Sequence, residues 1–192
     1  IHNTFIYTGY HVWSVVFSLI VIFVYILIRF RKWQFSLGAV LAAFHDVIIV
    51  LSLFSIFYGL LPFSLEIDQA FIAAILTIIG YSLNDTIVVS DRIRENFRSQ
   101  RGVNPDEVVD LSINQMLSRT LITSLTTLLV LFALFILGGE LIKGFSLALI
   151  IGVLIGTYSS IYVVANMLLM FGINQEDMAI PDPDEGPLDD MP

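Results

Sequence analysis

The sequence predicts an all-α polytopic membrane protein with five transmembrane helices. Apolar residues make up 57% of the 192 residues and charged residues only 14%, whereas soluble domains have about 45–50% apolar and about 25% charged residues. The apolar residues also gather in five stretches, each close to the roughly 20 residues with which a helix crosses a bilayer. A single soluble core is therefore excluded.

The five predicted spans follow one another along most of the chain, between a short stub over residues 1–11 and a tail over residues 172–192. They cover residues 12–30, 36–60, 70–90, 120–137 and 144–171. The tail holds seven acidic residues and no basic one, a composition typical of disorder. Without the tail the acidic and basic residues nearly balance, so no basic stripe for nucleic acid is expected.

The charges of the linkers predict how the spans are oriented. Of the nine Lys and Arg residues, eight lie at the end of the first span or in the linkers that follow the first and third spans, and only Lys143 lies in another linker. By the positive-inside rule these two linkers are cytoplasmic, which places the tail in the cytoplasm and the N-terminus outside. Because the chain opens without a signal peptide, we expect it to be the C-terminal part of a longer protein.

The cytoplasmic linker over residues 92–118 predicts a short amphipathic helix. Asn104 is suited to the N-cap and Pro105 to the first helical position, and Asp106 and Glu107 follow in the first turn. Apolar residues then recur at helical spacing: Val109, Ile113, Met116 and Leu117. A helix that lies on the membrane surface and leads into the fourth span is expected, and a docking site for a cytosolic partner is the alternative.

The last span carries small residues at strict four-residue spacing: Ala148, Gly152, Gly156 and Ser160. A ridge of small side chains lets a second helix approach closely. The ridge predicts helix packing, against a neighbour in this chain or in a partner, whereas Val153 beside it is expected to face lipid.

Two acidic residues, Asp46 and Asp85, lie inside predicted spans. Each ionisable group there costs about 2.5–3.5 kcal/mol on insertion scales, so it indicates a pathway or a coupling site. At 1.5 Å per residue Asp46 comes near the midplane, and Asp85 lies about 8 Å from the cytoplasmic boundary. Ser82 and Asn84 are the supporting polar positions around Asp85.

Antiparallel packing of the third and fourth spans predicts that Asp85 lies beside Arg119, with Thr123 on the same polar stripe. Such a pair favours the ionised acid and would break when a proton arrives. The alternatives are a static interhelical clamp at Asp85 and an Arg119 that reaches to the lipid headgroups. His45 adjoins Asp46 but is expected to point about 100° away, as a packing histidine rather than a relay member.

Other classes of chemistry lack their sequence signals. The chain has no cysteine, and nothing in it has the spacing of metal ligands, a nucleophile with its base, or a phosphate-binding loop. We therefore expect no metal, no cofactor and no covalent catalysis.

Four runs of sequence carry a resemblance to a known family: AFHDVII at 43–49, GYSLNDTIVVSDRIREN at 80–96, SRTLITS at 118–124 and GFS at 144–146. Over residues 12–172 the chain resembles SecF, a subunit of the bacterial SecDF complex in the RND superfamily of proton-driven transporters. The resemblance implies an RND-type six-helix half whose first helix and periplasmic domain precede the five helices of this chain.

The resemblance also implies a function in the Sec pathway of protein transport across the inner membrane. A SecF-like chain would be a proton-coupled accessory subunit that promotes the late stage of protein translocation. The resemblance implies that Asp85 takes part in proton transport, that Arg119 is the basic partner of that acid, and that Asp46 occupies a further motif position. The implied partners are SecD, the translocon SecYEG, YajC, YidC, unfolded preprotein and membrane lipid.

Two other functions stay open from the residues alone. A small-molecule exporter of the RND type would need long substrate-selecting loops, and the linkers at 61–69 and 138–143 are short for that purpose. A purely structural membrane scaffold would use its intramembrane charges only to clamp helices together.

Overall fold

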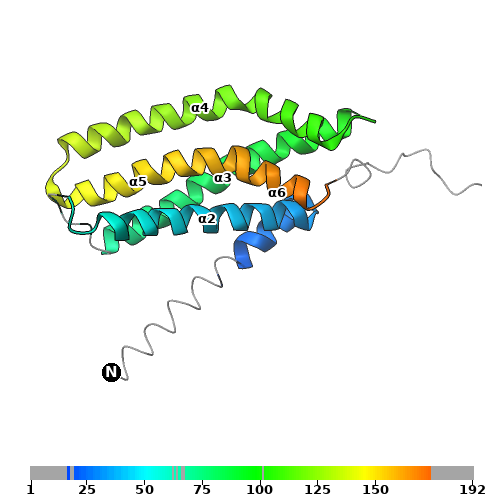
Figure 1. Ribbon diagram of the computed structural model, residues 1–192. Coiled ribbons are helices and arrows are strands. Elements are labelled where there is room, and N and C mark those ends of the chain that lie inside the picture. Colours follow the sequence, from blue (N-terminus) through cyan, green and yellow to red (C-terminus); the bar gives the residue numbers. More distant parts are fainter. Residues whose placement is uncertain are drawn as a thin grey trace, which may run out of the picture.

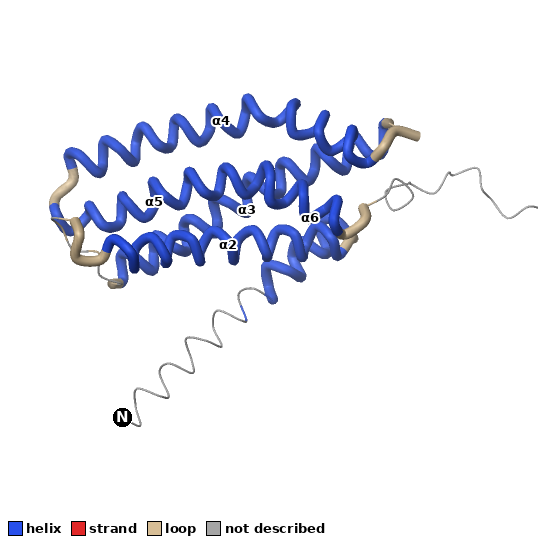
Figure 2. The backbone as a smooth tube through the Cα atoms, viewed as in Figure 1, coloured by secondary structure: helices blue, strands red, loops and turns tan. Residues whose placement is uncertain are grey.

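The computed structural model describes residues 17, 20–61, 63, 65, 68–100 and 102–173 of the chain. All regular structure in this part is helical (Figures 1 and 2), which confirms the predicted fold class. In chain order the elements are α2 (Trp33–Phe57), α3 (Gln69–Ser99), α4 (Pro105–Leu137), α5 (Glu140–Tyr158), the π-helical turn η1 (Ser159–Val163) and α6 (Val164–Met170). A shorter apolar helix, Ile20–Phe30, precedes them.

Four described helices are long and apolar enough to cross a membrane. They are α2, α3, α4 and the continuous helix Ile142–Met170, which combines most of α5 with η1 and α6. The predicted spans at 36–60, 70–90, 120–137 and 144–171 fall largely on these four. Of the predicted first span the structure describes Phe17 and the helix Ile20–Phe30, and the stub at 1–11 and the acidic residues of the tail lie outside the described residues.

Two helices extend well beyond the thickness of a bilayer core. α3 has 31 residues and α4 has 33, which gives lengths of about 46 and 50 Å against a core of about 30 Å. Both extend at the end of the bundle that carries Arg29, Arg94 and Arg98, which we call the basic end. α4 begins at Pro105 after Asn104, as predicted. The amphipathic segment is helical, but it continues without a break into α4 and forms no separate surface helix.

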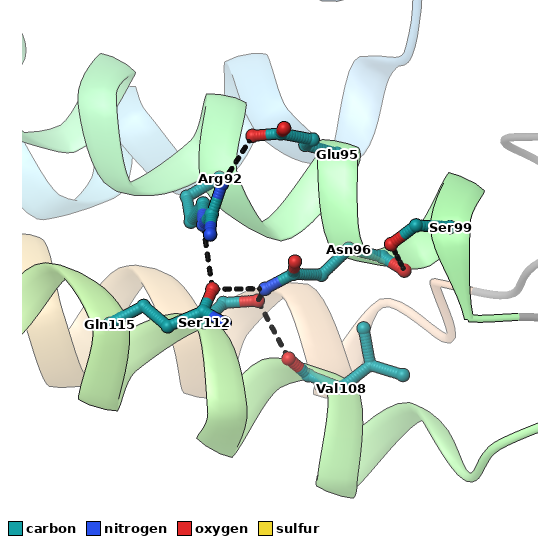
Figure 3. A network of polar contacts seen from close by, with 7 residues as sticks. All are labelled: Arg92, Glu95, Asn96, Ser99, Val108, Ser112 and Gln115. Atoms are coloured by element: carbon teal, nitrogen blue, oxygen red, sulfur yellow. Dashed lines mark hydrogen bonds and ion pairs between the residues drawn. The ribbon is translucent and has the colours of Figure 1, made fainter.

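The extension of α3 packs against the beginning of α4 through a polar network (Figure 3). Asn96 Nδ2 donates to Ser112 Oγ and to Gln115 Oε1, both at 2.8 Å. Arg92 Nε donates to the same Gln115 oxygen at 2.6 Å, and Val109 is buried in the adjacent apolar cluster. The face that was predicted to contact the membrane or a cytosolic partner is therefore packed against α3.

The helix made of α5, η1 and α6 is the centre of the bundle. In its most apolar window 61% of the residues are buried, against 22–28% in the other three long helices, and it packs against α2, α3 and α4. Figure 1 shows it running between these helices. A helix surrounded in this way needs small side chains wherever a neighbour comes close.

The small-residue ridge packs on α3 within this chain. A Cβ atom added to Gly152 would clash with the side chain of Ile78, and one added to Gly156 would lie 3.3 Å from the Cβ of Ser82. The expectation that Val153 faces lipid was wrong, because its side chain is only 3% exposed. Neighbouring helices therefore cover the face of the central helix that carries Val153, and the next residue, Leu154, faces outward at 52% exposed.

The apolar core divides into two clusters along the bundle. The cluster at the basic end includes Ala42 of α2 and Val89 of α3, and the cluster at the opposite end includes Val50 of α2 and Ile78 of α3. Between the clusters, the helices carry a connected set of polar side chains. The fold thereby places a polar layer across the middle of a membrane bundle.

Candidate functional site

The polar layer consists of side chains from α2, α3, α4, α5 and η1 that lie between the two apolar clusters. Its members are Asp46, Tyr81, Ser82, Asp85, Thr120, Ser124, Thr157, Ser159 and Ser160. Both intramembrane acids that the sequence singled out belong to it, so the layer is the candidate site.

Asp46 is completely buried, at 0% exposed. Its Oδ2 accepts hydrogen bonds from Ser82 Oγ at 2.6 Å and from Ser159 Oγ at 2.8 Å. One carboxylate oxygen thus joins α2, α3 and η1. Since a buried polar group costs free energy unless it is hydrogen-bonded, these two hydroxyls lower the free-energy cost of burying the Asp46 carboxyl group.

His45 also reaches Asp46, which corrects the expectation that it points away. The imidazole Nδ1 lies 3.1 Å from Asp46 Oδ1. Neighbouring residues on a helix are offset by 100° at Cβ, but the two polar atoms each lie two bonds beyond Cβ and turn toward one another. His45 is partly exposed, so Asp46 has a titratable neighbour at the edge of the layer.

Asp85 is partly buried and is held by a different pair of hydroxyls. Thr120 Oγ1 donates to its Oδ1 at 3.2 Å, and Ser160 Oγ donates to its Oδ2 at 2.8 Å. Asp85 therefore joins α3 to α4 and to η1, whereas Asp46 has no hydrogen bond to α4 among the described residues.

The π-helical turn places two consecutive serines on two different acids. Ser159 donates to Asp46 of α2, and Ser160 donates to Asp85 of α3. A π-helical turn is wider than an α-helical one and occurs mostly as a single turn, frequently at functional sites. Because both serines belong to the same turn, a shift of η1 changes the surroundings of both acids.

The partners of the two acids are hydroxyl groups and one imidazole. In the part of the chain that the structure describes, no Lys or Arg forms an ion pair with Asp46 or Asp85. A hydroxyl can donate to an ionised carboxylate and can accept from a protonated one. Such a site offers hydrogen-bond partners to either protonation state of the acid, with stronger bonds to the ionised form.

Arg119 does not form the predicted pair with Asp85 in this structure. Its side chain is exposed, and the next residue, Thr120, is buried against the acid. Thr123 shares the exposed face of Arg119 and donates to the Arg119 carbonyl oxygen at 2.9 Å. The face of α4 that packs against α3 thus carries Thr120 and not the predicted Arg119 and Thr123, a difference of one residue or about 100° around the helix. Asn84 is exposed as well.

Several members of the layer were not singled out as site residues from the sequence. Ser124 Oγ lies 2.6 Å from Thr157 Oγ1 and 3.2 Å from the Tyr81 hydroxyl, which links α3, α4 and α5. Ser160 was noted for packing alone. The spacing of polar residues along α4 could have indicated Thr120 and Ser124. Both follow Ser112 at helical spacing, by eight and twelve residues, so all three lie on the buried face of that helix.

Comparisons with known proteins agree with this architecture. Residues 7–174 match the family described as protein export membrane protein SecD/SecF, C-terminal. The protein translocase subunit SecF of Rhodothermus marinus is 63% identical over 158 residues, which cover 82% of this chain and 51% of that protein. SecF of Vibrio alginolyticus is 49% identical over 181 residues, which cover 93% of this chain and 55% of that protein.

A solved structure is similar too. SecDF of Thermus thermophilus, described as a translocon-associated membrane protein, superposes with a TM-score of 0.73 at 48% identity, covering 83% of this chain and 21% of that one. The chain spans about half the length of the SecF relatives it matches. Since the family match extends over most of its residues, the chain belongs to the SecD/SecF C-terminal family of protein export membrane proteins.

Proposed function

We propose that this chain is the membrane-embedded part of a SecF-type translocase subunit, which uses the proton-motive force to promote the late stage of protein export. The family membership supports the assignment to export. The observation that carries the proton coupling is the polar layer, in which Asp46 and Asp85 are both hydrogen-bonded by hydroxyls of one π-helical turn.

Orientation follows from the distribution of basic residues. With the basic end in the cytoplasm, a proton that enters from the outside reaches the polar layer before it is released. Moving one charge across 100 mV supplies about 2.3 kcal/mol, which shifts a two-state equilibrium about fifty-fold. One proton per step is therefore enough to bias a conformational change.

Asp85 is the proposed coupling acid. Protonation would remove the charge that strengthens the hydrogen bonds from Thr120 and Ser160, so the contact of α3 with α4 and η1 would loosen. A rotation of α4 by one residue would then exchange Thr120 for Arg119, which would draw Asp85 back to the ionised state. In this cycle Asp46 anchors α2 to η1.

We propose that the movement acts on preprotein through a periplasmic domain of the full-length subunit, in the part of the SecF relatives that this chain does not cover. We propose SecD as the partner in the membrane, because SecF-like and SecD-like chains are joined in proteins such as SecDF, and the translocon SecYEG with YajC and YidC as the assembly it serves. The proposed location is the bacterial inner membrane, with the acidic tail in the cytoplasm.

The test uses the full-length subunit, assembled with its SecD partner in inverted membrane vesicles. Preprotein export is measured at saturating ATP in energised and in uncoupled membranes. We expect Asp85→Asn to assemble normally and to lose the stimulation by the proton-motive force, because the amide cannot exchange a proton. Asp110→Asn is the matched control, since Asp110 is an exposed acid of α4 outside the polar layer. If Asp85→Asn retains full stimulation, the acid is a static clamp and the scaffold function is favoured.

A further inference from the structure

An open pocket at the basic end of the bundle lies outside the polar layer and has no part in the proposed proton route. Its volume is about 550 Å³, and it is lined by Arg29, Asp91, Arg94, Glu95, Arg98 and Ser99. The lining comes from the last turns of α3 and from the end of the helix Ile20–Phe30. Three arginines against two acids leave the pocket with a net positive charge.

The two acids of the pocket are already paired. Asp91 Oδ2 lies 2.6 Å from Arg29 Nη2, and Glu95 Oε2 lies 2.7 Å from Nη1 of Arg92, which does not line the pocket. Figure 3 shows the Glu95 side chain joined to Arg92. Within the described residues, Arg94 and Arg98 form no ion pair, so neither guanidinium group has a carboxylate in direct contact.

Arg94 shows the effect of this imbalance. Its Nε atom is buried without a hydrogen-bond partner among the described residues. Its pKa is lowered from the usual value of an arginine, first by burial and then by repulsion from Arg98, with smaller contributions from Arg29 and Arg31. Asp91 opposes the shift. An anion in the pocket would relieve this repulsion and would supply acceptors to the guanidinium groups.

We propose that this pocket binds the phosphate group of an anionic phospholipid. Guanidinium groups match the geometry of phosphate oxygens, and basic pockets between membrane helices on the cytoplasmic side bind anionic headgroups. Asp91 follows directly on the predicted third span, which ends at Ser90, so the pocket lies at the level of the headgroups.

The surface beside the pocket favours a lipid over a soluble anion. On the helix Ile20–Phe30, Val21 and Tyr25 precede Arg29 by eight and four residues and so lie on its face. Both side chains are at least half exposed. An acyl chain that descends from a headgroup at Arg29 would lie along these two side chains.

The experiment measures lipid binding to the full-length subunit with its SecD partner, purified in detergent, by native mass spectrometry. Phosphatidylglycerol and phosphatidylcholine with the same acyl chains are compared at equal concentration. We expect the parent to retain phosphatidylglycerol preferentially, and Arg94→Gln or Arg98→Gln to reduce that preference about fivefold each, since one basic residue near the membrane surface contributes about 1 kcal/mol.

Arg94→Lys should keep most of the preference because the charge remains. Lys143→Gln is the matched control, because it removes one positive charge from the first turn of α5, which contributes no residue to the pocket. Arg98 is exposed, so Arg98→Gln decides the question even if Arg94→Gln fails to assemble.

Four results would overturn the proposal. The parent could bind both lipids equally, or Lys143→Gln could lose as much preference as the pocket variants. Inorganic phosphate at the lipid's concentration could displace phosphatidylglycerol, which would identify a soluble anion as the ligand. Phosphatidylglycerol could also bind only after residues 174–192 are removed, which would make the acidic tail the occupant.

Discussion

Asp46 and Asp85 are alike in their chemistry and different in their surroundings. Each accepts two hydroxyl hydrogen bonds, and each takes one of them from η1. Asp46 is fully buried between α2, α3 and η1, whereas Asp85 is partly exposed and takes its other bond from α4. The carboxyl group is therefore fully enclosed by the bundle at Asp46, whereas at Asp85 it is partly exposed and contacts α4.

The difference suggests a division of roles. α4 is the least buried of the four long helices, so it can shift while the rest of the bundle stays packed. Such a shift changes the partners of Asp85 and leaves those of Asp46 intact. Proton exchange is thus expected at Asp85, and Asp46 is expected to hold the central helix in place.

Gly152→Leu should have the largest effect, because it removes the close packing on which both acids depend. Any Cβ at this position clashes with Ile78, and the central helix would have to move away from α3. We expect a loss of about 3 kcal/mol, the upper end of the range for overpacked cores, measured as resistance of the purified complex to thermal unfolding. Gly80→Leu is the matched control, since a Cβ there meets no atom within 4 Å. Equal stability of the two variants would contradict the packing of α5 on α3.

Asp46→Ala should destabilise the protein more than Asp85→Ala does. The first change leaves the hydroxyl of Ser82 buried without an acceptor, at a cost of about 1–3 kcal/mol, and leaves the buried hydroxyl of Ser159 only the Gly156 carbonyl oxygen at 3.4 Å. The hydroxyl of Ser160 keeps the Thr157 carbonyl oxygen at 3.1 Å as an acceptor when Asp85 is lost. We expect losses of about 2 and about 1 kcal/mol, measured by the same thermal unfolding. A larger loss for Asp85→Ala would reverse the proposed roles.

The sequence contains enough information for the helices and for the two acids, because hydropathy and intramembrane charge are local properties. Which side chains pair across helices is harder to predict from the sequence. Thr123, Thr126 and Thr127 look like a polar stripe of α4, but each donates its hydroxyl to a carbonyl oxygen of its own helix. A threonine satisfied in this way can face lipid without cost, so polar residues alone do not mark the buried face.

The π-helical turn lies beyond prediction from the sequence for a different reason. Ser159 and Ser160 read as two neighbouring positions of a regular helix, which would be 100° apart. The wider turn is compatible with contacts to α2 and α3 at the same time, and those contacts exist only after the bundle has assembled. The contact of His45 with Asp46 likewise depends on side-chain rotamers that periodicity does not specify.

Arg119→Gln should have the smallest effect on stability and a large effect on export. The side chain is exposed and forms no ion pair among the described residues, so its replacement should change the free energy of unfolding by less than about 0.5 kcal/mol. If a rotation of α4 brings Arg119 to Asp85 during the cycle, the same variant should lose the stimulation of export by the proton-motive force. The double variant Asp85→Asn with Arg119→Gln should then export no less than either single variant, because both changes block the same step.

A destabilisation of about 2 kcal/mol by Arg119→Gln alone would indicate that the pair already exists in the resting protein, with Arg119 on the face of α4 that contacts α3, as the sequence predicted. Normal export by Arg119→Gln would instead remove the arginine from the coupling step and leave Asp85 with hydroxyl partners alone.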